Sequence, residues 1–377
     1  MGLNTSSASL WNREMQNLIS TVKITEKYDF DGDFVIPFYN QKQIFFGFMM
    51  KNGTFNVIQS TLSQDDIVKK KVTDFEVKDV VQFKTDSVIV LTENNIIILC
   101  FRNNEIIIRN VIEERAKKII KVNNNSFIAI NESNEVLLIT NLDENKNENT
   151  VKLWHANEDI NDGIIFQNGF GAKKLIIATC KSIAILEIKK DTDTKIKEVN
   201  INTTKVVQYD NNNLMFSSKE SNSLYLFDVS LEGPLNKVET KIDNIKDIIS
   251  LEEGTVLFYN ENTICTFTLQ LSPQYLSCKI ESEIIKLFTM KDKRINIVIC
   301  KDGTVTIIRH PIFKSHDKKA VIESYKLFKY HNSSIKLACA ASDYSFITFD
   351  EDHICIFWES FPEWYNAPEQ FGMFKDI

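Results

Sequence analysis

Short apolar runs separated by turn-forming residues recur along the whole chain. Residues 299–310 show the pattern, because β-branched residues stand on both sides of Asp302-Gly303. Asp and Gly tolerate the positive φ angles that a two-residue hairpin turn requires, so this stretch predicts a β-hairpin. Seven further stretches have the same form, with turns expected at Asn52-Gly53, Asn94-Asn95, Ser133-Asn134, Lys181-Ser182, Ser221-Asn222, Glu261-Asn262 and Asp352-His353.

Each of these hairpins is preceded by another short apolar strand. The leading strands are expected to begin near Phe34, Val80, Ile119, Ile164, Val206, Ile245, Ile284 and Ile335. Their mean spacing is 43 residues. A unit of about 40 to 45 residues with four strands is typical of one blade of a β-propeller. The pattern therefore predicts an all-β fold, a single β-propeller with eight blades; seven blades are the alternative, if one unit is a paired insertion.

The distribution of polar residues within the runs agrees with this fold. Each propeller blade packs between two others, so its inner strands are covered on both faces and should be continuously apolar. Residues 96–101, 183–186 and 305–308 have this character. Outer strands should alternate apolar and polar residues instead, and residues 22–28 and 238–242 do so.

The last unit shows only three strands before Pro362 and Pro368, which make a fourth strand in that segment unfavourable. Residues 21–27 form a strand that is left over before the first unit. We expect this N-terminal strand to complete the last blade and close the propeller, which removes the open sheet edges.

The hairpin-and-blade pattern resembles the WD-repeat propellers, whose third strand typically ends in Trp-Asp. In the last unit the sequence ICIFWE places Trp358-Glu359 at this position, whereas the Gly-His dipeptide that usually opens a repeat is missing from the chain. The resemblance covers almost the whole chain and rests on period and strand pattern, so the chain resembles a divergent member of the WD-repeat-like β-propeller family. That resemblance implies a scaffold for protein–protein interactions.

Composition and charge narrow the function classes. The chain has 44 Lys and Arg against 51 Asp and Glu, a net charge of −7, so no global positive field attracts nucleic acid. The seven cysteines include no C-x-x-C pair, which is typical of reduced thiols in the cytoplasm or nucleus. No apolar run approaches the ~20 residues that a membrane-spanning helix needs.

No motif for catalysis stands out. G-x-S-x-G, a Gly-rich phosphate loop and H-E-x-x-H are all missing. The five histidines are expected in or next to surface loops, and their spacing matches no zinc-binding pattern. The sequence thus predicts no enzyme, with no catalytic residues, no cofactor and no metal site. The histidines are His155, His310, His316, His331 and His353.

Both ends of the chain carry features of their own. The sequence MGLNTS fits an acylation pattern at Gly2, although one acyl chain binds membranes only marginally and no polybasic stretch follows. A short amphipathic helix is expected just beyond it. The C-terminal segment is rich in aromatic residues, which either fold back onto the propeller or anchor a partner. Its candidate partner-binding residues are Trp364, Tyr365, Phe371 and Phe374.

These observations predict an N-terminal extension with a short helix at 1–20, a propeller at 21–360 and an aromatic-rich tail at 361–377. The expected function is a non-catalytic scaffold that binds other protein subunits in an intracellular complex, for RNA processing, ribosome assembly or vesicle trafficking. The alternative is an RNA-facing, non-catalytic partner of an RNA-modifying or RNA-processing enzyme. It would use a basic loop at Lys69, Lys70 and Lys71.

Overall fold

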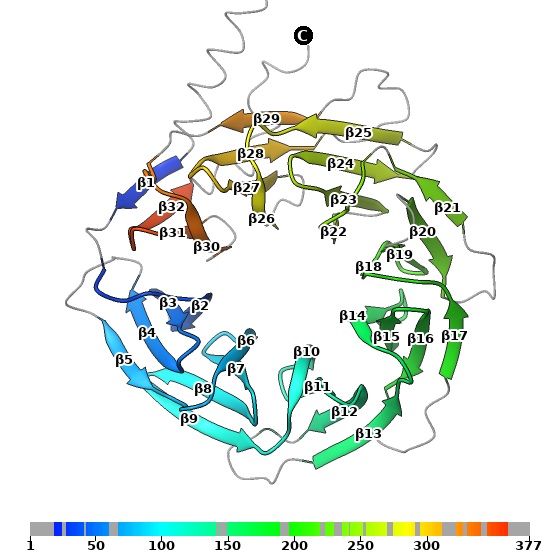
Figure 1. The fold of residues 1–377 in the computed structure, drawn as a ribbon, viewed down its shortest axis with the longest axis horizontal. Coiled ribbons are helices and arrows are strands. Elements are labelled where there is room, and N and C mark those ends of the chain that lie inside the picture. The colour runs from blue at the N-terminus through cyan, green and yellow to red at the C-terminus, as the bar shows by residue number, and fades with distance from the viewer. Residues whose placement is uncertain are drawn as a thin grey trace, which may run out of the picture. The chain divides into compact units, whose positions relative to one another are not determined.

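The structure is a computed structural model. It describes residues 19–24, 28–40, 43–59, 67–140, 142, 149–188, 196–218, 223–229, 236–240, 242–251, 254–269, 274–290, 295–310, 322–326, 330–340 and 345–360. These residues form 32 β-strands and no helix (Figure 1). The chain divides into two compact units, residues 1–71 together with 278–377, and residues 72–277.

Residues 72–277 form five four-stranded sheets. Within each sheet the strand order follows the chain. The first two sheets are β6 (Val77–Lys84), β7 (Ser87–Thr92), β8 (Ile96–Arg102) and β9 (Glu105–Ile112), then β10 (Ala116–Asn123), β11 (Ser126–Asn131), β12 (Glu135–Thr140) and β13 (Asn149–His155). The third is β14 (Ile160–Gln167), β15 (Lys173–Thr179), β16 (Ser182–Glu187) and β17 (Ile196–Asn200). The fourth and fifth are β18 (Lys205–Gln208), β19 (Asn213–Ser217), β20 (Ser223–Asp228) and β21 (Asn236–Glu239), then β22 (Asp247–Ser250), β23 (Thr255–Tyr259), β24 (Thr263–Thr268) and β25 (Gln274–Lys279), where the unit ends.

The other unit holds three sheets of the same kind. They are β2 (Phe34–Asn40), β3 (Gln43–Met49), β4 (Thr54–Gln59) and β5 (Val68–Lys71), then β26 (Ile284–Thr289), β27 (Ile295–Cys300), β28 (Val305–Arg309) and β29 (Glu323–Lys326). The last consists of β30 (Ile335–Ala340), β31 (Ser345–Asp350), β32 (Cys355–Ser360) and β1 (Ile19–Ile24).

These eight sheets are the blades of a β-propeller, which confirms the predicted fold class and the count of eight. The first strands of consecutive blades lie against one another, β6 to β10, β14, β18 and β22 in the larger unit and β26, β30 and β2 in the other. All eight first strands fall where the 43-residue period predicts a leading strand.

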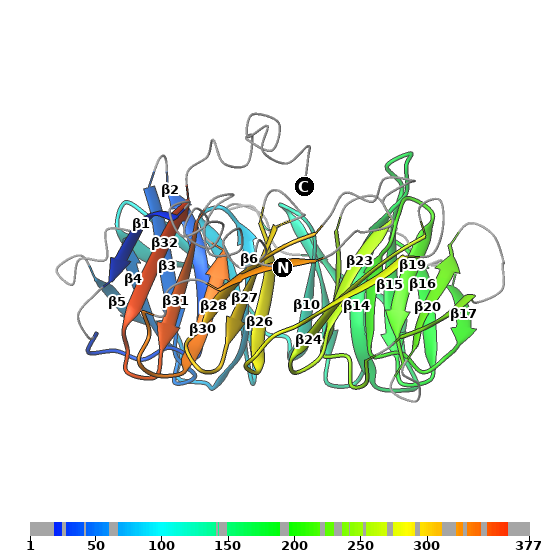
Figure 2. The same ribbon diagram turned by 90° about the horizontal axis from the view of Figure 1, so that it is seen from above.

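The N-terminal strand completes the last blade, as the sequence predicts. β1 pairs antiparallel with β32, and the register joins Val22 to Trp358 and Ile24 to Ile356. Figures 1 and 2 both show β1, in dark blue, beside β32, in orange-red, although the two strands come from opposite ends of the sequence. The pairing covers an edge of β32 that would otherwise present free backbone groups.

The hairpin turns at Gly53, Gly303 and His353 differ from the expectation in one respect. At Gly303 the amide of Cys300 donates to the carbonyl of Thr304 (2.9 Å) and the amide of Gly303 to Cys300 (3.2 Å), so three residues, not two, form the turn. Only the last of them has positive φ, 84° at Gly303. This is a type I turn followed by a left-handed residue, which needs one permissive position instead of two. The same pattern recurs with Gly53 and His353 at that position.

The core lies between neighbouring blades. Every residue of β7 and β27 is buried, as expected for inner strands that are covered on both faces. In the larger unit, for example, Phe83, Ile89 and Phe127 belong to one cluster built from the sheets β6–β9 and β10–β13. Outer strands are more exposed, and β21 shows no fully buried residue.

Candidate functional site

The last blade contains a buried series of hydrogen-bonded polar side chains from two strands and a loop. The indole Nε1–H of Trp358 on β32 donates to Thr348 Oγ1 on β31 at 2.8 Å. Thr348 Oγ1 lies 2.7 Å from Nε2 of His331, and Nδ1 of His331 lies 2.8 Å from the carboxylate of Asp350. All four side chains are buried. These hydrogen bonds therefore connect β32, the strand that carries Trp358, to the loop that precedes the blade.

The donors and acceptors of these four side chains can all be satisfied with a neutral His331. Since Thr348 Oγ1 accepts from Trp358, its own proton is free to reach Nε2 of His331. The His331 proton then sits on Nδ1 and is donated to Asp350, so a neutral imidazole satisfies every partner. Burial lowers the pKa of His331, and the hydrogen bond to Asp350 opposes that shift.

The placement of two histidines corrects the sequence prediction. His331 and His310 are buried instead of exposed at the surface, whereas His155 is exposed and His353 lies in a turn. His331 follows Tyr330, so a search for Gly-His could not find it. Neither ring nitrogen of His310 has a hydrogen-bond partner among the residues that the structure describes, and burial lowers its pKa to about 4. His316 lies outside the described residues.

Lys69, Lys70 and Lys71 do not form a loop. They belong to β5, the outer strand of the first blade, where they pair with Asn56, Phe55 and Thr54 of β4. All three are exposed, and Lys71 Nζ donates to the backbone carbonyl of Asn52. The loop assignment was wrong because a run of lysines on an edge strand lacks the apolar alternation that marks a strand. A role in RNA binding stays a prediction.

The remaining candidate residues lie outside the described part of the chain. These are Gly2, the N-terminal helix and the aromatic tail residues Trp364, Tyr365, Phe371 and Phe374. Their proposed roles in acylation and partner binding stay predictions, as do the domain limits 1–20, 21–360 and 361–377.

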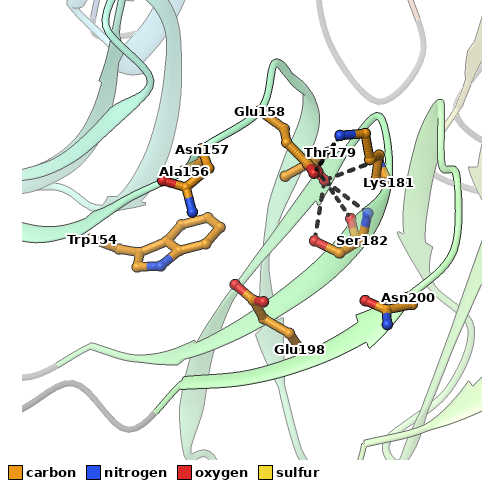
Figure 3. Close-up of a pocket in the computed structure, with 9 residues that line it drawn as sticks. All are labelled: Trp154, Ala156, Asn157, Glu158, Thr179, Lys181, Ser182, Glu198 and Asn200. Atoms are coloured by element: carbon orange, nitrogen blue, oxygen red, sulfur yellow. Dashed lines mark hydrogen bonds and ion pairs between the residues drawn. The ribbon is translucent and has the colours of Figure 1, made fainter.

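A cavity of about 430 Å³ opens between two blades of the larger unit (Figure 3). Its walls come from β13, from the loop to β14, from the β15–β16 hairpin and from β17. The lining residues are Trp154, Ala156, Asn157, Glu158, Thr179, Lys181, Ser182, Glu198 and Asn200. Sequence reasoning missed this site because it joins residues from outer strands and turns that belong to different repeats.

Two carboxylates and one ammonium give the cavity its charge. Glu158 Oε1 lies 3.0 Å from Nζ of Lys181, and its other oxygen lies 3.2 Å from the hydroxyl of Thr179. The hydrogen bond with Glu158 raises the pKa of Lys181. No ion pair or hydrogen bond joins the exposed carboxylate of Glu198 to another residue that the structure describes. Figure 3 shows Trp154 on one side of the cavity, Lys181, Ser182 and Asn200 on the other, and the two glutamates at its ends.

One apolar side chain is almost fully exposed to solvent. Phe170, in the turn between β14 and β15, is 98% exposed. The turn that carries it is well ordered by hydrogen bonds: Asn168 Oδ1 accepts from the amides of Phe170 (3.1 Å) and Ala172 (2.8 Å), and Gly171 adopts a φ of 80°. A second apolar area lies on the outer strand β9, where Ile107, Ile108 and Val111 are exposed.

Among the described residues, no group of three or more His, Cys, Asp or Glu side chains is arranged to hold a metal ion. All seven cysteines are free and are buried or partly buried. No helix of the described residues is long and apolar enough to span a membrane.

Comparison with solved structures extends these observations. No protein-family model matches this sequence, and no curated protein matches it either. The chain is similar in structure to Saccharomyces cerevisiae Sqt1, with a TM-score of 0.63 and 10% identity over 89% of this chain and 98% of that one. It is similar to the C-terminal WD40 domain of Sif2, with a TM-score of 0.61 and 12% identity over 90% of this chain and 98% of that domain.

The WD40 domain of SCAP from fission yeast is comparable, with a TM-score of 0.60 and 10% identity over 90% of this chain and 98% of that one. At such low identity the likeness concerns the fold alone. Together with the eight four-stranded blades, it shows that the chain has the fold of a WD40 β-propeller, a fold that typically serves as a protein-interaction scaffold.

Proposed function

We propose that the protein is a non-catalytic scaffold that binds other protein subunits of an intracellular complex, in the cytoplasm or nucleus. The observation that carries this proposal is Phe170, an aromatic side chain that is 98% exposed at the tip of a hydrogen-bonded turn. Burial of one phenylalanine on a partner contributes about 2 kcal/mol. Because the turn is already ordered, little of that gain is lost to ordering the backbone on binding.

The fold supports the same conclusion. Stacked blades hold their turns in fixed positions, so several surfaces are available to partners at once. Phe170 and the apolar residues of β9 belong to different blades of the larger unit. Complexes of RNA processing, ribosome assembly and vesicle trafficking are the settings that we expect.

Co-purification of the tagged full chain from the cells that produce it tests the scaffold function. We expect stoichiometric partner subunits with the wild type and at least one of them to be lost with Phe170→Ser. The melting temperature of Phe170→Ser should equal that of the wild type, since this side chain has almost no contacts to lose. Phe75→Ser, which removes a phenylalanine that is 40% exposed elsewhere in the same unit, is the control. Purification of the wild type as a monomer without partners would contradict the proposal.

The second candidate function, an RNA-facing partner of an RNA-processing enzyme, is favoured by the three exposed lysines of β5. Successive strand residues point to opposite faces, so Lys69 and Lys71 lie on one face and Lys70 on the other. Such a surface predicts salt-dependent RNA binding that is lost when the three lysines are changed to glutamine. A lack of RNA binding at low salt would remove this candidate.

A further inference from the structure

The cavity between β13 and β17 offers an aromatic wall that is held in place. Trp154 is partly buried and packs against the core cluster that contains Ala156 and Leu186. Its indole therefore has a fixed orientation, and the part that the core does not cover faces the cavity (Figure 3). An aromatic face fixed in this way attracts cations through the negative potential above the ring.

The charges in the cavity are unbalanced. Lys181 is already paired with Glu158, which leaves the carboxylate of Glu198 without a cation among the described residues. In the register of β16 and β17, Glu198 pairs with Ala184 and Asn200 pairs with Ser182. Glu198 and Asn200 are two positions apart on β17, so their side chains project from the same face of the sheet. A ligand with a positive charge would pair with Glu198 while it lies over Trp154.

We propose that this cavity binds an arginine side chain from a peptide segment of a partner protein. A planar guanidinium stacks on an indole and also presents several N–H donors in one plane, enough for the Glu198 carboxylate and the side-chain carbonyl of Asn200. An ammonium is more strongly hydrated and cannot stack, so lysine should bind less well. The volume of about 430 Å³ accommodates one such side chain with part of its main chain. This inference rests on the proposed scaffold function and names the chemistry of one partner.

The probe is the peptide acetyl-Gly-Ser-Arg-Ser-Gly-amide, titrated into the full chain with 5-fluorotryptophan in place of tryptophan. The fluorine signal of Trp154, assigned with Trp154→Phe, should shift as the peptide binds. The same peptide with citrulline, which has the shape of arginine but no charge, should bind about tenfold more weakly, because it loses both the attraction to the ring and the ion pair.

Variants locate the interaction. Glu198→Gln should weaken arginine-peptide binding about threefold, the effect of one exposed ion pair. Glu105→Gln removes an exposed carboxylate from β9, on another blade, and should leave binding unchanged. Equal affinity of the arginine and citrulline peptides, or equal effects of the two variants, would overturn the proposal. So would a shift of the Trp154 signal with maltotriose but not with the arginine peptide, which would identify a carbohydrate site.

The outcome is independent of the scaffold test. Absence of arginine binding with intact, Phe170-dependent co-purification would remove this inference and leave the scaffold function. Arginine binding without any co-purified subunit would remove the scaffold function, and with it the partner protein, and leave only an arginine-binding cavity.

Discussion

At the scale of single residues, backbone conformation decides which turns accept which side chains. Gly303 has a φ of 84°, and a Cβ built on it would lie 2.8 Å from the carbonyl oxygen of Ser333 and 3.1 Å from Cβ of His331. We expect Gly303→Ala to lower the free energy of unfolding by about 2 to 3 kcal/mol, since backbone strain and a steric clash both contribute.

Gly171→Ala is the matched control for Gly303→Ala. Gly171 has a similar φ of 80°, but the nearest atom to its Cβ would be Nε2 of Gln167 at 3.9 Å. This variant should lose only the strain, about 1 kcal/mol. Urea denaturation measures both values, and equal losses would show that the clash at Gly303 relaxes without cost.

A second prediction at this scale concerns His310. Burial lowers its folded-state pKa to about 4, so the unfolded chain takes up the proton first as the pH falls. Above pH 6.5, His310 is neutral in both the folded and the unfolded chain and costs no stability. Between pH 6.5 and about 4 the free energy of unfolding should fall progressively, by about 3 kcal/mol in total.

His310→Leu tests this linkage by urea denaturation at a series of pH values. The variant should lack that part of the pH dependence, whatever its absolute stability. His331, whose pKa is also lowered, remains as a common background in both proteins. An identical pH dependence of the two proteins would show that His310 is not the responsible group.

At the scale of elements, one carboxylate joins three blades of the larger unit. Asp162 on β14 pairs with Lys118 on β10, and its second oxygen accepts a 3.0 Å hydrogen bond from the amide of Val206 on β18. The Asp162 side chain is only 11% exposed. We expect Asp162→Ala to cost about 3 kcal/mol of unfolding free energy, because it leaves a half-buried ammonium and a buried amide without their partner.

The control for this prediction is an exposed ion pair between two blades of the same unit. Glu132 lies 2.9 Å from Lys78 with half of its side chain exposed, so Glu132→Ala should cost less than about 1 kcal/mol. In a double-mutant cycle with Lys118→Met, the losses of Asp162→Ala and Lys118→Met should not add, since both remove the same pair. Strict additivity in urea denaturation would argue against the bridge.

At the scale of the whole molecule, the blades could be predicted from sequence and the polar sites could not. Each leading strand and hairpin is local, so hydrophobic runs and turn residues are enough to find β6 or β27 and to count the repeats. The Trp358–Thr348–His331–Asp350 chain depends on which strands pair and where a loop ends, and only Trp358 carried a signal in sequence. The cavity leaves even less of a signal in the sequence. Its walls combine β13 and β17, which are the outer strands of two successive blades.

The last prediction concerns β1, the strand that completes the last blade. It pairs with β32, which comes from the other end of the sequence. Without residues 1–25, the edge of β32 that pairs with β1 presents free backbone N–H and C=O groups. The truncated chain should therefore form concentration-dependent oligomers, detected by analytical ultracentrifugation. A synthetic peptide of residues 17–26, added in excess, should restore the monomer because it can take the place of β1, whereas a scrambled peptide should not. A truncated chain that stays monomeric with unchanged stability would show that the edge of β32 is protected without β1.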